Sequence, residues 1–288
     1  MKIILCMILA AAACVGFEIH REVTRFRVVT YKIRSPKLKG LDSPERIVFL
    51  SDLHNQEYGE HNALLLEKIH EIQPALILIG GDMFVKKKSC PYEPALRFVQ
   101  ELAKSFPVYY ANGNHEQMRK DNPEEYGQSY EDYKRTLERA GVHFVENDSM
   151  DFLLEQCRIN VTGLEIPEEY YVHFHEPELP MEAVTERIGQ PEEDVYQILL
   201  AHNPTYMDRY VEWGADLVLS GHLHGGVVRI PGAEGVISPA FKIFPKYSGG
   251  YYREKNTDIV VSKGLGVHTI KVRLFNPAEV VVLEIAEK

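Results

Sequence analysis

The sequence predicts an α/β layered domain behind a short apolar leader. Short runs rich in Val, Ile and Leu end at small or polar residues, as in "RIVFLSD" (46–52) and "ALILIGGD" (75–82). Helix-like stretches separate several of these runs, and such alternation is typical of an α/β domain whose strands are buried on both faces. A chain of 288 residues is long enough for one domain of this class.

The first segment differs from the rest of the chain. Ile3–Phe17 is uncharged and apolar and follows Lys2. The run is shorter than the roughly 20 residues that a spanning helix needs, which favours a signal peptide or a membrane anchor over residues 1–20. The basic residues after the run favour a cytoplasmic domain by the positive-inside rule. A cleaved export signal favours the opposite side, so the sequence predicts membrane association and leaves the side open.

The elements that follow can be placed in order. Residues 21–44 form a linker and a first strand, and residues 45–288 form the domain. Beyond the two runs quoted above, further strands are predicted at 108–114, 158–163, 197–202 and 216–222. Apolar residues at helical spacing predict helices at 60–72, 94–104 and 126–140.

Two later regions break this alternation. Residues 258–266 and 279–285 predict strands with no helix between them, which suggests a second, more antiparallel sheet. Residues 167–191 contain several prolines and many acids, and they are predicted to form an insertion over the fold.

Composition excludes some classes of function. A net charge of −10 argues against a nucleic-acid partner, since such a protein needs a basic face. The four cysteines have neither the spacing of a disulfide framework nor that of a cysteine-ligated zinc site.

Potential metal ligands follow five of the predicted strands. They are Asp52, His54, Asp82, Asn114, His115, His202, His222 and His224. Alone, Asp82 fits a helix N-cap and Asn114 a turn residue. The carboxyl ends of strands in an α/β sheet meet at one crevice, so together these residues predict a shared site. Its nitrogen and oxygen donors suit two divalent ions, and the lack of sulfur favours manganese, iron or zinc.

The ordered set of motifs identifies a resemblance. Asp52-x-His54, Gly81-Asp82, Gly113-Asn114-His115, His202 and Gly221-His222-x-His224 resemble those of the calcineurin-like metallophosphoesterase superfamily. The apolar leader and the tail "VSKGLGVHTIKVRLFNPAEVVVLEI" resemble its membrane-associated YkuE/YaeI-like phosphodiesterase branch. The resemblance implies a four-layer αββα sandwich with a dinuclear metal site.

The resemblance also implies a role for each motif residue. One ion is held by Asp52, His54, Asp82 and His224. The other is held by Asp82, Asn114, His202 and His222, so that Asp82 bridges the pair. His115 then points at the substrate, where it stabilises the transition state or protonates the leaving alkoxide.

The predicted function is hydrolysis of phosphodiester or pyrophosphate bonds at this dinuclear site. The substrate is a phosphorylated small molecule or a lipid-linked one, of membrane or cell-envelope origin. The alternatives are a phosphomonoesterase or protein phosphatase on the same core, and a non-catalytic scaffold. The complete ligand set disfavours the scaffold. Lys86, Arg119 and His268 are candidate substrate-binding residues, although the basic residues fit a solvated charged loop better.

Overall fold

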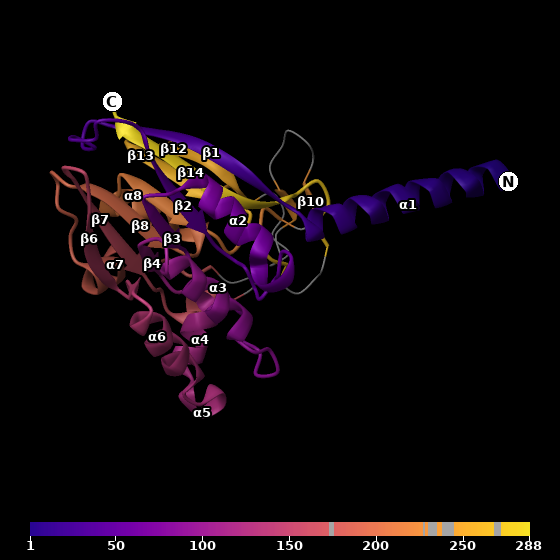
Figure 1. The fold of residues 1–288 in the computed structure, drawn as a ribbon, viewed down its shortest axis with the longest axis horizontal. Coiled ribbons are helices and arrows are strands. Elements are labelled where there is room, and N and C mark those ends of the chain that lie inside the picture. Colours follow the sequence, from indigo (N-terminus) through magenta and orange to yellow (C-terminus); the bar gives the residue numbers. More distant parts are fainter. Residues whose placement is uncertain (173–175, 227, 230–234, 238–244, 268–271) are drawn as a thin grey trace.

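Two six-stranded sheets form the centre of the protein (Figure 1). The computed structural model describes residues 1–172, 176–226, 228–229, 235–237, 245–267 and 272–288. The first sheet contains, in spatial order, β1 (Phe26–Ser35), β14 (Ala278–Glu287), β2 (Glu45–Leu50), β3 (Leu76–Ile79), β4 (Val108–Tyr110) and β5 (Val142–Phe144). The second contains β12 (Gly250–Glu254), β13 (Thr257–Val261), β9 (Leu217–Ser220), β8 (Tyr196–Ala201), β7 (Cys157–Leu164) and β6 (Asp148–Leu154). A small ribbon pairs β10 (Val228–Arg229) with β11 (Gly235–Ile237).

The strands were predicted to be buried on both faces, and β2, β3, β8 and β9 are. In β3 and β8 every residue is buried, because alternate side chains enter two different cores. Phe49, Leu78, Ile198 and Leu219 belong to the core between the two sheets. Their neighbours along the strands face the helices on the outside.

Helices cover the outer face of each sheet. The first sheet is covered by α2 (Ala63–Ile72), α3 (Glu93–Ala103) and α6 (Ser129–Arg139), and the second by α7 (Met181–Ile188) and α8 (Met207–Trp213). The short helices α4 (Asn114–Asp121) and α5 (Pro123–Tyr126) and the 3-10 turns η1 (Glu60–Asn62), η2 (Glu168–Tyr171) and η3 (Pro204–Tyr206) lie in the connections. The order helix, sheet, sheet, helix confirms the four-layer αββα sandwich.

The prediction for the tail strands was wrong. They do not form a sheet of their own: β13 pairs parallel to β9 in the second sheet. The last strand, β14, lies in the first sheet between β1, to which it is parallel, and β2, to which it is antiparallel. Both of its faces are buried, because Ala278, Val280 and Val282 enter the core under the outer helices and Val281, Leu283 and Ile285 enter the core between the sheets.

The prediction of an insertion at 167–191 was also wrong. Within that region, α7 is the helix that connects β7 to β8, and its Val184 and Ile188 are buried against the second sheet together with Leu179. The helix is therefore part of one of the four layers. Of the acids there, Glu182 and Glu186 lie on the exposed side of α7, and the others lie in η2 and in the segment before α7.

The leader is a single long helix, α1 (Lys2–Thr24), which projects from the body of the molecule (Figure 1). It leads directly into β1, whose first residue, Phe26, pairs with Ala278 of β14. Because β14 is antiparallel to β2, the start of β1 lies at the end of the sheet where β2 finishes. This is the end at which the predicted ligands lie.

Candidate metal centre

The predicted ligands lie in loops that turn sharply at the carboxyl ends of β2, β3, β4, β8 and β9. Five of these ligands have a left-handed backbone, with φ between 47° and 68°: Asp52, His54, Asp82, His222 and His224. Such a backbone is strained for residues other than glycine and persists only where the surroundings enforce it. The clustering of five strained residues at one place indicates a functional site.

Asp82 is the centre of the cluster. Its Oδ2 lies 3.1 Å from Nε2 of His202, 3.8 Å from Nε2 of His115 and 3.9 Å from Nε2 of His54. The residue is 2 % exposed. Asp82 belongs to two of the three groups of side chains whose ligand atoms lie within 4.8 Å of one another, namely His54–Asp82–His115 and Asp82–His202–His222.

The third group is Asp52, His54 and His224. The two imidazole Nε2 atoms lie 3.1 Å apart, and Nε2 of His224 is 3.4 Å from Oδ1 of Asp52. Lone pairs from two rings and a carboxylate thus converge on one point. Such convergence is typical of ligands for a shared cation.

Asn114 offers a neutral oxygen donor at the start of α4, directly before His115. Its side-chain Oδ1 is buried and has no hydrogen-bond partner among the described residues. A buried acceptor without a donor is costly, and a cation removes that cost. The donors in and beside the cluster therefore fit divalent cations bound by nitrogen and oxygen.

The hydrogen bonds of His202 and His115 prepare their rings for different roles. Nδ1 of His202 lies 2.7 Å from the carbonyl oxygen of Gly80, to which it donates, so that Nε2 presents a lone pair to the site. Nδ1 of His115 accepts from the backbone N–H of Lys86 at 2.7 Å. The neutral His115 ring therefore carries its proton on Nε2, which faces Asp82. The first arrangement suits a metal ligand and the second a hydrogen-bond donor.

Burial and opposite charges set the pKa values in the cluster. Burial raises the pKa of Asp52 to about 6, with a further contribution from Asp82 and an opposing one from His202. Burial also raises the pKa of Asp82, but the neighbouring His202 and His115 lower it by more. The pKa of Asp82 therefore lies well below the usual range. For His202, burial lowers the pKa, but Asp82 and Asp52 raise it to about 10. Without a cation, a proton on His202 balances part of the carboxylate charge.

Glu116 holds the Asp82 loop in place and was not predicted from the sequence. Its carboxylate accepts from the backbone N–H groups of Asp82 and Met83 at 2.8 Å each, and from that of Gly113 at 3.1 Å. It is fully buried, and burial raises its pKa to about 7. The sequence signal was available, since Glu116 stands three residues after Gly113 at the start of a helix, the place of a capping acid.

The loop 262–266 also supports the cluster, because it packs against Asp52. The N–H of Gly266 donates to the carbonyl oxygen of Asp52 at 2.6 Å. A Cβ on Gly264 would lie 2.8 Å from that of Asp52, so the close approach requires glycine. Asn276 continues this support by donating to the carbonyl oxygen of His224 at 2.7 Å.

The three candidate substrate-binding residues have different outcomes. Lys86 contributes its backbone N–H to His115. The Arg119 side chain has a structural role, because it donates to the carbonyl oxygens of Val85 and Cys90 at 2.9 Å each and lies over the Phe84 ring. Contact of Lys86 or Arg119 with substrate stays a prediction. His268 lies outside the described residues.

Fold and site together define a class of protein, an αββα sandwich with a cluster of metal-binding residues at the strand ends. Residues 45–226 match the calcineurin-like phosphoesterase family. The chain belongs to this family, and it is a phosphoric ester hydrolase.

Several relatives match over nearly the whole chain. YpbG, an uncharacterised protein of Bacillus subtilis, is 25 % identical over 92 % of this chain and 89 % of its own length. The metallophosphoesterase YkuE of the same organism is 24 % identical, over 95 % and 90 %. Phosphodiesterase YaeI of Escherichia coli is 24 % identical, over 96 % and 94 %.

Among solved structures, the phosphopantetheinyl hydrolase PptH of Mycobacterium tuberculosis is similar in fold. Its TM-score is 0.50 at 13 % identity, over 79 % of this chain and 90 % of that one. This likeness concerns the fold alone.

Proposed function

We propose that this protein hydrolyses phosphodiester or pyrophosphate bonds with two divalent ions that share Asp82. One observation carries the proposal: a single buried carboxylate oxygen lies within 4 Å of three histidine Nε2 atoms, two of them in separate ligand groups. The relative YaeI, which is called a phosphodiesterase, supports the choice of a diester.

Each ligand has a place in this scheme. Asp52, His54, Asp82 and His224 would hold one ion, and Asp82, Asn114, His202 and His222 the other. When bound, such ions neutralise the phosphoryl oxygens and activate water. The donors are nitrogen and oxygen, which favours manganese, iron or zinc. The bond from His202 to Gly80 and the bond from Ser51 to Asp52 orient two of the ligands before any ion arrives.

His115 is proposed to stabilise the leaving group. Because its Nδ1 accepts from Lys86, the proton on Nε2 points into the site. That N–H can donate a hydrogen bond to the departing alkoxide, which takes its own proton from water, so the ring stays neutral while the Lys86 amide keeps it in its orientation. Assistance to a leaving group by a positioned side chain contributes typically about 10²–10⁴-fold to a rate.

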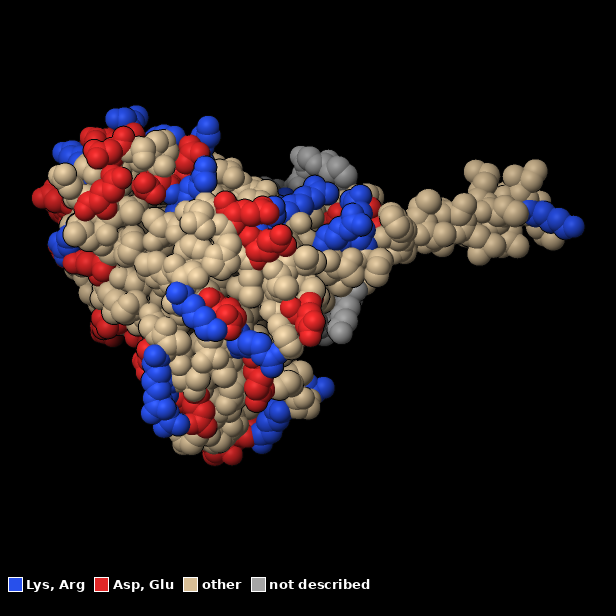
Figure 2. Space-filling view, viewed as in Figure 1, with Lys and Arg blue, Asp and Glu red and all other residues tan. Residues whose placement is uncertain are grey.

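We further propose that the substrate lies in a membrane. Helix α1 is long and apolar enough to cross a bilayer by length and composition. In Figure 2 it is an almost uncharged rod that meets the body at a group of Lys or Arg side chains with some Asp or Glu among them. The chain has Arg21, Arg25 and Arg27 around the end of α1, where Arg21 pairs with Glu18 and Arg27 with Glu22. Arginines at this position suit the head-group region of an anionic bilayer.

The base of α1 is connected to the metal centre through a short series of contacts. The Phe26 ring contacts Tyr58 at 4.9 Å between centroids, and the Tyr58 hydroxyl donates to the carbonyl oxygen of Leu265. The next residue, Gly266, donates to Asp52. A helix inserted in a bilayer would therefore hold the metal centre near the head groups, which supports a lipid-linked phosphate as substrate.

The experiment uses the full chain in liposomes, stripped of metal and reloaded with Mn²⁺, Zn²⁺ or Mg²⁺. A chromogenic phosphodiester and a phosphomonoester are assayed in parallel, with phospholipids of the same liposomes as the third substrate. The proposal predicts metal-restored diester hydrolysis and release of phosphorylated head groups. Faster hydrolysis of the monoester than of the diester would identify the protein as a phosphomonoesterase and overturn the phosphodiesterase proposal. Hydrolysis of the chromogenic diester without hydrolysis of phospholipids would overturn only the proposal of a membrane substrate.

A further inference from the structure

A second concavity lies at the end of the sandwich opposite the metal centre. It has a volume of about 950 Å³ and lies between the edge strand β1 and the edge strand β12. Tyr196, Asp216 and Thr257, which line it, stand at or just before the amino ends of β8, β9 and β13. The metal ligands follow the carboxyl ends of β8 and β9, so the length of those strands separates the two places. We name this concavity the basic cleft.

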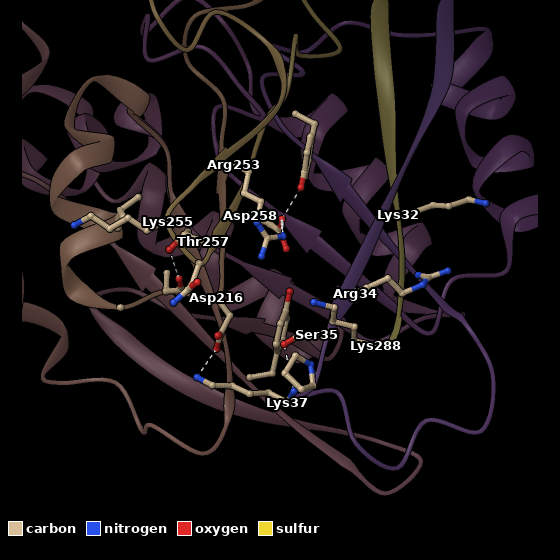
Figure 3. A pocket seen from close by; sticks show the side chains of 17 residues that line it. Lys32, Arg34, Ser35, Lys37, Asp216, Arg253, Lys255, Thr257, Asp258 and Lys288 are labelled. Atoms are coloured by element: carbon tan, nitrogen blue, oxygen red, sulfur yellow. Dashed lines mark hydrogen bonds and ion pairs between the residues drawn. The ribbon is translucent and has the colours of Figure 1, made fainter.

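Positive charge gathers around the basic cleft, although the whole chain carries a net charge of −10. Its cationic lining residues are Lys32, Arg34, Lys37, Arg253, Lys255 and Lys288. Figure 3 shows Lys37 and Arg253 beside the two lining carboxylates, and Lys32 and Lys255 extending outward from opposite walls.

Three of these cations are neutralised by ion pairs. Lys37 pairs with Asp216 at 2.9 Å, Arg253 with Asp258 at 2.8 Å and Arg34 with Glu284 at 3.1 Å.

The remaining cations, Lys32, Lys255 and Lys288, form no ion pair with the described residues. Even if the terminal carboxylate of Lys288 offsets one of them, positive charge is left in excess around the cleft. Like charges that share one concavity repel one another, and a bound anion would relieve that repulsion.

A buried hydroxyl points to the same conclusion independently of the surface charge. The side chain of Tyr196 is fully buried and lines the cleft, and its hydroxyl has no hydrogen-bond partner among the described residues. Burial raises the pKa of Tyr196 well above the usual range, and Asp258 and Asp216 add to the effect, so the hydroxyl keeps its proton. It is therefore a neutral donor without an acceptor. A ligand oxygen can contact the Tyr196 hydroxyl once the long side chains that cover it change rotamer.

We propose that the basic cleft binds a small organic polyphosphate. Its volume lies in the range of about 300–1,000 Å³ that is usual for small-molecule sites, which is large enough for a nucleotide. Flexible lysines on both walls suit several phosphate groups, and the Tyr196 hydroxyl suits one phosphate oxygen. A long polyanion is disfavoured because it would continue onto the acidic remainder of the surface. The proposal does not depend on the metal centre.

The test is calorimetric titration of the full chain in non-ionic detergent, with EDTA present so that the metal centre holds no ion. Inorganic triphosphate and ATP are the probes. We expect saturable binding that weakens at least about tenfold between 50 and 200 mM salt, as expected for several cation–phosphate contacts. The double variant Lys32→Gln/Lys255→Gln should weaken it about tenfold or more. Tyr196→Phe, which keeps the ring and removes the donor, should weaken it about fivefold.

The matched control is Lys68→Gln/Lys104→Gln, which removes the same charge from α2 and from the end of α3, both away from the cleft. It should bind both probes as the unmodified protein does. Asp82→Asn should also bind them unchanged, which separates this site from the metal centre. No saturable binding of either probe, or equal weakening by the control pair, would overturn the proposal. Tighter binding of ATP than of triphosphate would support it and show that the nucleoside contributes.

Discussion

The two ends of the sandwich collect charged side chains in opposite ways. At the carboxyl ends of the strands, Asp52 and Asp82 are fully or almost fully buried, and loops with strained backbones fix their direction. At the amino ends, the basic cleft is lined by long cations such as Lys32 and Lys255, which are exposed.

The difference indicates how each end can act on a phosphate. Buried, short side chains lose little freedom when they bind an ion, so they can hold a reaction geometry. Long exposed side chains are screened by solvent and adapt to a ligand, so they suit binding without chemistry. Substitutions should therefore have large, specific effects at the metal centre and small, salt-dependent ones at the basic cleft.

The largest effect is expected for Asp82→Asn. The shared carboxylate would lose a negative oxygen that both proposed ion sites use. Mutation of a residue that only hydrogen-bonds to a metal ligand typically reduces metal affinity or activity by about 10–100-fold. Loss of a shared ligand should therefore reduce phosphodiester turnover by more than about 100-fold. Asp208→Asn, at an exposed position of α8, is the control and should keep full turnover.

His115→Ala should reduce turnover by about 10²–10⁴-fold, since it removes the proposed hydrogen-bond donor to the leaving group and leaves the ligands in place. Metal content, measured by elemental analysis, should stay as in the unmodified protein. The exposed His143→Ala serves as control. A variant that loses metal together with activity would assign His115 to the metal instead.

Glu116→Ala should lower the free energy of unfolding by about 1–3 kcal/mol, measured by urea denaturation of the metal-free protein. The substitution leaves the buried N–H groups of Asp82, Met83 and Gly113 without their acceptor. Each unpaired buried donor costs about 1–3 kcal/mol, and removal of the buried carboxyl group, whose own burial is unfavourable, offsets part of the sum. Glu138→Ala, on the exposed side of α6, should change stability by less than about 0.5 kcal/mol. Equal effects would mean that Glu116 is not the support of this loop.

The sequence predicted which candidate metal ligands lie close together better than it predicted the edges of the sheets. Asp82 and His202 could be found because each follows a recognisable apolar strand, and strand ends meet at one crevice. The place of β14 could not be found, because a strand's own pattern does not say which strands it pairs with. The support from Gly266 was hidden for a similar reason, since it joins positions more than 200 residues apart.

At the basic cleft, Lys37→Gln is the substitution to compare with Glu116→Ala, and it should have the smallest effect on stability. It breaks the ion pair with Asp216, whose two side chains are 30 % and 17 % exposed. Partly exposed pairs of this kind contribute about 0–1 kcal/mol, so the free energy of unfolding should fall by less than about 1 kcal/mol, and less still in high salt. A loss as large as that of Glu116→Ala would remove the contrast between the two ends.

Asp82, as the residue that the two proposed ions would share, is the centre of the proposed chemistry. The direct measurement is the number of metal ions bound per chain, by elemental analysis after dialysis against Mn²⁺, for the unmodified protein and for Asp82→Asn. We predict two ions per chain in the unmodified protein and loss of both, or of all but one weakly held ion, in the variant. Two ions retained by Asp82→Asn, or none bound by the unmodified protein, would contradict the shared site.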